Sequence, residues 1–364
     1  MTPDVARALD RLALTEDVVR LAVLPDVHLA KEVCVGVALA SNARLFPDAV
    51  GGDIGCGMAA IRFHCDGAAL THRKTVARLL SRLYEEVPIT KHRVGKAACP
   101  EGESLKGAIL SHPTLEKRLA RDGALQLGSL GRGNHFLEFQ VDQDDALWAM
   151  VHSGSRAMGQ AIRAHHLKTA TRSSSGLMSI SAESTEGEAY LNDVGWALDY
   201  AAANRAAMIA AVSGILFDEL RVDPDADSFV SCHHNFVARE EIGGRLLWVH
   251  RKGVISARQD EPGLVPGSMG TSSFHVVGRG SEDSLCSSSH GAGRAMSRGE
   301  ARRRISVRAL EKQMAHVWFD QRMAARLVDE APSAYKDISA VMRAQRDLTR
   351  IIRELRPVLT FKGG

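Results

Sequence analysis

The stretch ALWAMVHSGSR, Ala146–Arg156, joins an apolar run to a polar cluster that contains a histidine and an arginine. Three further stretches share this design: RLAVLPDVH (20–28), SFVSCHHNF (228–236) and LLWVHRKGVISA (246–257). Short apolar and β-branched runs of this kind are typical of strands. Loops that follow strands commonly carry binding and catalytic residues. The pattern therefore predicts strands whose exit loops hold the chemistry.

Helical patterns separate these runs, over about 73–86, 115–122, 156–172, 186–218 and most of 291–355. Strands and helices mixed in this way predict an α/β fold, with central mixed sheets and a helical C-terminal portion. No stretch has the composition of a linker, so we expect one compact domain over residues 1–364. The polar region at about 90–125 is the predicted insertion or mobile flap.

The composition is that of an enzyme with a sizeable core, since 45% of its 364 residues are hydrophobic and 24% are charged. The net charge of +3 is close to balance, so any affinity for nucleic acid must come from a local patch. The most apolar stretch, 196–217, contains Asp199, Asn204 and Arg205 and is expected to be a buried helix, with no membrane span. Six cysteines without a CxxC motif, and no secretion signal, predict reduced thiols in the cytoplasm.

The glycine-rich stretch GGDIGCGM, Gly51–Met58, places Asp53 and Cys56 three residues apart. Glycine is favoured where a backbone turns sharply or approaches a ligand closely. A carboxylate and a thiol on such a backbone are therefore expected to converge on a metal ion.

Further candidate ligands lie in clusters of their own: Asn134 and His135 in GSLGRGNHFLE, His152 in VHSGSR, and His233 and His234 in CHHNF. One carboxylate, one thiolate and three imidazoles exceed the needs of a single tetrahedral zinc site. A thiolate can bridge two ions, so a dinuclear site is reasonable. This donor set is compatible with manganese and excludes neither zinc nor iron. Histidines outside such clusters are expected to be structural, namely His28, His64, His165, His166 and His250.

Two later stretches, PGSMGTSSF (266–274) and SLCSSSHGAGRAMSR (284–298), have the composition of anion-binding loops. His290 precedes a predicted helix, on which Arg294, Arg298 and Arg302 follow at four-residue steps on one face. Between 294 and 308 six arginines accompany one glutamate, which forms a basic patch. The alternative is a solvated surface helix. A P-loop motif is absent from the sequence.

The six motifs GGDIGCGM, GSLGRGNHFLE, VHSGSR, CHHN, PGSMG and HGAGRAMSR occur in the order found in the RtcB family of RNA-splicing ligases, which the chain resembles over nearly its whole length. The resemblance implies a GTP- and manganese-dependent enzyme for tRNA splicing or RNA repair. Such an enzyme joins RNA ends with a 3′-phosphate or 2′,3′-cyclic phosphate to 5′-hydroxyl ends. Two Mn²⁺ ions would be bound by Asp53, Cys56, His135, His152 and His234, with the thiolate as the bridge.

The resemblance also implies a covalent guanylate on His290, the catalytic residue. The implied nucleotide-binding residues are Asn134, Glu138, His234, Asn235, Pro266, Gly267, Ser268, Met269, Ser273, His290, Gly291, Ala292, Gly293, Tyr335 and Lys362. Within this set, Glu138 and Lys362 would read the guanine edge. The implied RNA-binding residues are Arg156, Arg294 and Arg298.

Two alternatives use the same residues differently. One is a dinuclear phosphatase or cyclic phosphodiesterase without nucleotide transfer, and the other is an inactive RNA-binding relative. The complete SSSHGAGR motif and Lys362 favour the ligase, since neither hydrolysis nor simple binding requires them. The expected partners are RNA and GTP, without a membrane.

Overall fold

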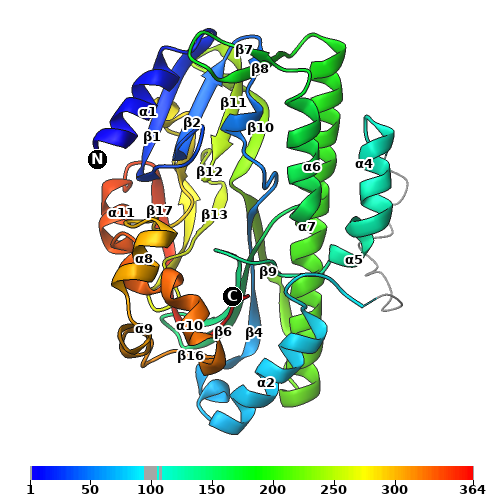
Figure 1. Cartoon of the computed structure of the whole chain (residues 1–364). Coiled ribbons are helices and arrows are strands. Elements are labelled where there is room, and N and C mark those ends of the chain that lie inside the picture. Colours follow the sequence, from blue (N-terminus) through cyan, green and yellow to red (C-terminus); the bar gives the residue numbers. More distant parts are fainter. Residues whose placement is uncertain (1, 94–104, 106–108, 364) are drawn as a thin grey trace.

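The structure is a computed structural model that describes residues 2–93, 105 and 109–363. Helices surround several antiparallel sheets, so the mixed α/β class is confirmed (Figure 1). The predicted insertion at 90–125 falls partly outside the described residues. Its later part is helical, as predicted for 115–122, and contains α4 (Pro113–Arg118), the π-helical turn η3 (Leu119–Gly123) and α5 (Ala124–Gln126).

The largest sheet of the described residues has eight strands, in the order β13–β14–β17–β5–β6–β4–β9, with β16 beside β17. The bounds of these strands are β4 Gly57–Asp66, β5 Phe136–Val141, β6 Ala146–Ser153, β9 Pro224–His233, β13 Pro262–Val265, β14 Ser273–Gly278, β16 Trp318–Phe319 and β17 Thr349–Phe361. All pairs are antiparallel except β16 with β17. The predicted strands at 146–156 and 228–236 are confirmed as β6 and β9.

Smaller sheets form the rest of the described strand structure. The second sheet has the order β1–β2–β11–β10, with β1 Val18–His28, β2 Val35–Ser41, β10 Asn235–Ile242 and β11 Arg245–Lys252. Two further sheets pair β12 (Val254–Ser256) with β15 (Ser287–Ser289), and β3 (Arg44–Leu45) with β8 (Met178–Ser181) and β7 (Thr171–Arg172). The predicted strands at 20–28 and 246–257 are confirmed as β1 and as β11 with β12.

The long helix α7 (Thr185–Leu220) lies along one face of the largest sheet, together with α2 (Arg73–Glu86) (Figure 1). Successive side chains of a strand point to opposite faces. On β6, Leu147 and Ala149 accordingly join the core beneath these helices, whereas Trp148 packs on the opposite face. By length and composition α7 could cross a membrane, but 56% of its most apolar window is buried inside the protein. The prediction of a buried helix is confirmed.

The remaining helices are short: α1 Pro3–Ala13, α6 Arg156–His166, α8 Arg298–Arg304, α9 Val307–Gln313, α10 Ala324–Leu327 and α11 Ile338–Ala344. The predicted helix at 73–86 is confirmed without a shift, as α2. The predicted helix at 156–172 ends early, at His166, and β7 follows it.

The prediction that most of 291–355 is helical is wrong. Only short helices occur there, and Thr349–Phe361 is β17, between β14 and β5 in the largest sheet. Leu355, Pro357 and Leu359 are buried while Arg356 is exposed, which is the two-residue period of a strand. Pro357 also disfavours a helix, because proline lacks the backbone N–H that a helix interior requires.

The predicted helix that starts behind His290 is also wrong, because α8 begins only at Arg298. The Ser297 side chain caps it by accepting a hydrogen bond from the Glu300 N–H. Upstream, Gly293 has a φ of 71°, and a Cβ there would lie 2.2 Å from the backbone oxygen of Asp26. Residue 293 must therefore be glycine in a left-handed turn, which a helix from His290 could not contain.

Candidate metal and nucleotide site

The candidate metal ligands converge because four neighbouring strands begin or end at one edge of the largest sheet. Gly57, the first residue of β4, pairs with Ser153 on β6 and with His233 on β9. Phe136, the first residue of β5, pairs with His152. In antiparallel neighbours the start of one strand lies beside the end of the next. This register brings together Cys56 before β4, His135 before β5, His152 in β6 and His234 after β9.

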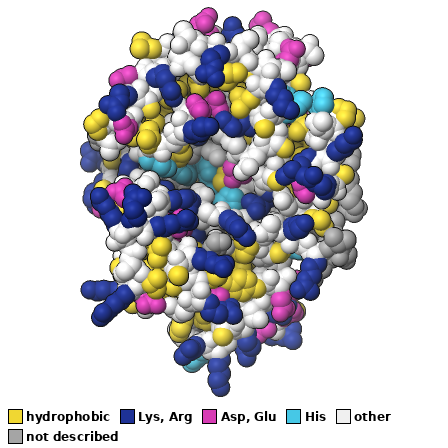
Figure 2. Space-filling model, in the orientation of Figure 1, with side chains coloured by type: hydrophobic (Ala, Val, Ile, Leu, Met, Phe, Trp, Pro, Cys, Tyr) yellow, Lys and Arg dark blue, Asp and Glu magenta, His cyan; other side chains and the backbone are white. Residues whose placement is uncertain are grey.

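A cleft of about 1640 Å³ opens at this edge of the sheet. Figure 2 shows histidine side chains gathered within a central hollow, with lysines and arginines around its rim. The cleft is lined by most of the predicted site residues: Asp53, Cys56, Asn134, Glu138, His152, His234, Asn235, Pro266–Met269, Ser273, His290–Gly293, Arg294, Arg298, Tyr335 and Lys362.

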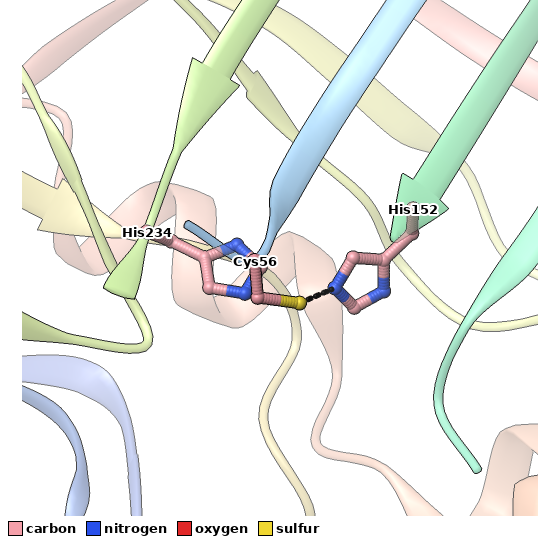
Figure 3. Close-up of side chains that lie close together, drawn as sticks. All are labelled: Cys56, His152 and His234. Carbon is pink, nitrogen blue, oxygen red and sulfur yellow. Dashed lines mark hydrogen bonds between the residues drawn. The ribbon is translucent and has the colours of Figure 1, made fainter. Parts of the chain in front are cut away.

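Cys56 lies at the centre of the candidate metal ligands. Its Sγ is 3.2 Å from His152 Nε2 and 3.4 Å from His135 Nε2, and His135 Nε2 is 2.9 Å from Asp53 Oδ2. Figure 3 shows Cys56 between His152 and His234, with Sγ directed toward the His152 ring. Two groups of donor atoms, each within 4.8 Å of one another, share this cysteine: Cys56 with His152 and His234, and Cys56 with Asp53 and His135.

The other ring nitrogens are arranged as they are in metal sites. Nδ1 of His135 donates to the Leu130 carbonyl at 2.9 Å, and Nδ1 of His152 donates to the Asn134 carbonyl at 3.1 Å. These bonds fix the tautomer and leave Nε2 with its lone pair. His234 is buried, and its Nδ1 has no hydrogen-bond partner among the described residues. An unpaired buried nitrogen is costly, so the donor set fits a bound cation.

Burial shifts the pKa values of Cys56, His152 and His234 toward their neutral forms. It raises the pKa of Cys56 well above the usual thiol value, and the negative charge of Asp53 adds to this shift. Burial and neighbouring imidazoles lower the pKa values of His152 and His234 well below the usual range. A bound divalent cation would reverse the pKa shift of Cys56, because metal binding stabilises the thiolate form. Carboxylate, thiolate and neutral imidazoles together suit a transition metal.

Two buried residues of α7 hold the loops that carry these ligands. Arg205 Nη1 donates to the carbonyls of Gly55 and Ser153, at 2.9 and 3.1 Å. Its Nη2 lies 3.3 Å from His233 Nδ1. These three partners adjoin Cys56, His152 and His234. Asn204, next along the helix, accepts from the N–H groups of Gly128 and Ser129 and donates to the hydroxyl of Ser153 and the carbonyl of Gly154.

His290 lies beside the metal cluster, with its ring centroid 4.8 Å from that of His234. Its Nδ1 donates to Oδ2 of Asp26 at 2.7 Å, and its backbone N–H donates to the same oxygen at 3.3 Å. Asp26 is fully buried near the end of β1. The carboxylate therefore fixes the orientation of the ring and, in the neutral imidazole, places the proton on Nδ1.

Glu138 and Lys362, the two residues predicted to read the guanine edge, are both buried. Glu138 accepts from Gln140 Nε2 at 2.7 Å and from Thr360 Oγ1 at 2.5 Å, and burial raises its pKa to about 7. Lys362 Nζ donates to Glu330 Oε2 at 2.7 Å and lies 5.8 Å from the centre of the Phe136 ring.

Asn235 has its side chain already engaged by backbone. Its Nδ2 donates to the carbonyl of Asp53 at 3.0 Å, and its Oδ1 accepts from the Gly253 N–H at 2.8 Å. Through these contacts Asn235 supports the loop that carries Asp53.

The predicted RNA-binding arginines do not lie together. Arg294 and Arg298 line the cleft and pair with Glu330, at 3.1 and 2.5 Å. Arg156 instead lies behind the His135 loop, where its Nε donates to Ser129 Oγ at 3.3 Å and its Nη1 is 3.4 Å from His135 Nδ1.

Sequence reasoning left three residues of this site without a role: Asp26, Arg205 and Glu330. Asp26 could have been identified from the sequence, because it lies near the end of the predicted strand, in LPDVH, as other site residues lie at the ends of their predicted strands. Arg205 carried only a weak signal, as a charge within an apolar stretch. Glu330 belongs to none of the motifs, and only its position in the fold reveals it.

Comparison with known proteins identifies relatives of the chain. A family model described as tRNA-splicing ligase RtcB matches residues 8–112 and 98–363. The chain is 38% identical to the RNA-splicing ligase RtcB of Escherichia coli strain K12, over 94% of this chain and 90% of that protein. It is 32% identical to RNA-splicing ligase RtcB2 of another Escherichia coli strain, over 95% and 88%. It is 30% identical to the RNA-splicing ligase RtcB of Mycobacterium tuberculosis, over 73% and 71%. The chain belongs to the RtcB family of RNA-splicing ligases.

Proposed function

We propose that this protein is a cytoplasmic, GTP-dependent ligase that joins RNA 3′-phosphate or 2′,3′-cyclic phosphate ends to 5′-hydroxyl ends. The intermediate would be a guanylate bound covalently to His290. One observation carries the proposal: a histidine fixed by a buried carboxylate lies directly beside a cluster of metal-ligating side chains, in a large cleft. A metal-dependent hydrolase that activates water at its ions needs no covalent histidine nucleophile, so the position of His290 favours the ligase.

His290 is suited to nucleophilic attack, since the bond from Nδ1 to Asp26 leaves the lone pair on Nε2. Nε2 forms a bond to the α-phosphorus of GTP as the bond to the β-phosphate oxygen breaks and pyrophosphate leaves. Nδ1 keeps its proton, and the adjacent carboxylate of Asp26 balances the positive charge that develops on the imidazole.

Asp53, Cys56, His135, His152 and His234 would hold two divalent ions, which we infer to be Mn²⁺. Bound divalent ions neutralise phosphate charge and act as Lewis acids. The chain itself supplies the anion-binding loops 266–269 and 291–293, which line the cleft next to His290. Gly267, Ser268 and Ala292 already donate their backbone N–H groups to Ser273 Oγ, Thr271 Oγ1 and the Pro266 carbonyl. The N–H groups of Met269, Gly291 and Gly293 are therefore the ones we propose for phosphate oxygens.

An oxygen of the RNA 3′-phosphate then attacks the phosphorus of the guanylate. The bond from that phosphorus to Nε2 breaks, so His290 is regenerated and the RNA carries GMP on its 3′-phosphate. The 5′-hydroxyl of the second RNA attacks the 3′-phosphorus, GMP leaves, and the hydroxyl proton passes to water. A cyclic phosphate would first be opened by water. Arg294 and Arg298 are assigned to the RNA phosphates, which arginine can bind through two parallel hydrogen bonds.

The direct test is incubation with α-labelled GTP and Mn²⁺, followed by denaturing electrophoresis. The expected result is a labelled protein whose bond is labile to acid and stable to base, as for a phosphoramidate. His290→Ala should remove the label, and label that persists in this variant would contradict the assignment. Release of phosphate from RNA ends without any labelled protein would favour the phosphatase or cyclic phosphodiesterase instead.

A further inference from the structure

We propose that Glu330 is a positioning residue that couples the guanine end of the cleft to its RNA end. The inference rests on the proposed function and extends it to a residue outside every sequence motif. Glu330 ends the 3₁₀ turn η6 (Val328–Glu330), lines the cleft and is 2% exposed.

The two carboxylate oxygens of Glu330 serve different ends of the site. Oε2 accepts from Lys362 Nζ at 2.7 Å and from the Tyr335 hydroxyl at 2.7 Å, both of which belong to the guanylate-binding set. Oε1 accepts from Arg294 Nη1 at 3.1 Å and from Arg298 Nη1 at 2.5 Å, both of which are assigned to RNA phosphates. One buried carboxylate is thus shared by the two substrates' binding groups.

The carboxylate charge of Glu330 acts on the basic side chains at both ends of the cleft. Lys362 is buried, and Glu330 is its ion-pair partner among the described residues. A buried ammonium needs a compensating charge, so Glu330 determines where the Lys362 side chain points. The same carboxylate neutralises part of the charge of Arg294 and Arg298 before RNA arrives. Loss of its charge should therefore misplace the lysine while it makes the arginine pair more attractive to phosphate.

The neighbouring residue offers a matched comparison. Asp329 is buried to the same extent, and its Oδ2 accepts from Arg298 at 3.1 Å and from Arg302 at 3.2 Å. Among the described residues its side chain contacts these arginines and neither Lys362 nor Tyr335. Glu330→Gln and Asp329→Asn each remove one buried negative charge from the same arginine cluster. Only Glu330→Gln also removes the ion pair at the guanine end.

The experiment measures two quantities in each variant. One is the GTP concentration for half-maximal labelling of His290, and the other is the salt dependence of binding to an RNA oligonucleotide with a 3′-phosphate. Glu330→Gln should raise the half-maximal GTP concentration by about tenfold, as expected for the loss of a charged hydrogen bond. Both variants should bind RNA more tightly at low salt, with a salt slope steeper by roughly one phosphate contact. Asp329→Asn should leave the half-maximal GTP concentration within about twofold of the parent value.

A purely structural role would instead weaken both GTP use and RNA binding. That outcome in Glu330→Gln, or an equal rise in the half-maximal GTP concentration in Asp329→Asn, would overturn the inference.

If Glu330→Gln folds poorly, Glu330→Asp replaces it. This substitution is tested both in the parent protein and in the Lys362→Met variant. The shortened carboxylate should raise half-maximal GTP in the parent and have no further effect without the lysine. An equal effect in both backgrounds would refute coupling through Lys362. A parent protein that forms no labelled adduct would overturn the proposed function itself. A labelled adduct whose half-maximal GTP concentration is the same in Glu330→Gln as in the parent would overturn this inference alone.

Discussion

Arg205→Lys should loosen the loops that carry the metal ligands while the buried positive charge is kept. Arg205 is fully buried, and its guanidinium bonds to the carbonyls of Gly55 and Ser153, at 2.9 and 3.1 Å. Because lysine is shorter than arginine, its ammonium cannot reach the position of Nη1, the nitrogen that donates to both carbonyls, unless the loops move, and one of the two bonds should be lost. An ammonium is more strongly hydrated than a guanidinium, so its desolvation at this buried site adds to the loss.

The expected decrease in the free energy of unfolding follows from the carbonyl that loses its hydrogen-bond donor. A buried acceptor without a partner costs about 1–3 kcal/mol. The contacts of Arg205 with Ser231 Oγ and His233 Nδ1, at 3.2 and 3.3 Å, are longer and should add little. The free energy of unfolding should therefore fall by about 1–3 kcal/mol, a substantial part of the roughly 5–15 kcal/mol of a typical protein.

Urea unfolding in the presence of a chelator measures this loss without any contribution from metal. Arg82→Lys is the matched control, because Arg82 also contacts α7, through Asp218, but at the surface. A surface ion pair contributes about 1 kcal/mol at most, so the control should differ little from the parent. An Arg205→Lys protein within about 0.5 kcal/mol of the parent would refute the view that this guanidinium holds the ligand loops.

Three further predictions concern the site itself. Cys56→Ser should lose both metal ions, because a neutral hydroxyl cannot replace a bridging thiolate, and two full equivalents in metal analysis would contradict this. Asp26→Asn should slow labelling of His290 by about 10- to 100-fold with unchanged metal content, and labelling at the parent rate would exclude an orienting role. Since burial raises the pKa of Glu138 from 4.5 to about 7, folding binds a proton between these pH values, and the stability that Glu138 contributes falls as the pH rises. Glu138→Gln should flatten that part of the pH–stability curve, and an unchanged curve would argue against the shift.

The candidate metal ligands could be proposed from sequence because each lies in its own glycine, serine or histidine cluster. Their convergence could not, since it depends on the register of four strands that are far apart in the chain. Gly57 pairs with both Ser153 and His233, and nothing local specifies those partners. The family resemblance supplied the grouping that the spacing alone left open.

The prediction that Arg294, Arg298 and Arg302 lie on one face of a helix was wrong for a different reason. A four-residue spacing fits a helix, but it does not require one. Gly293 adopts a left-handed conformation, and Arg294 forms an isolated bridge with Tyr335 instead of a helical turn. The arginines still meet, because Asp329 and Glu330 attract them from a distant segment. Tertiary ion pairs therefore produced the cluster that a helical pattern seemed to explain.

The position of β17 has a consequence for how the chain folds during synthesis. Among the described strands β17 is the last in sequence, yet it joins β13 and β14 to β5, β6, β4 and β9. Until the ribosome releases these residues, β14 and β5 each present an unpaired edge, which is a known route to aggregation. Such distant pairing also slows folding. Lys362 follows directly, so the lysine proposed to read the guanine edge leaves the ribosome only after the strand that joins the two halves of the sheet.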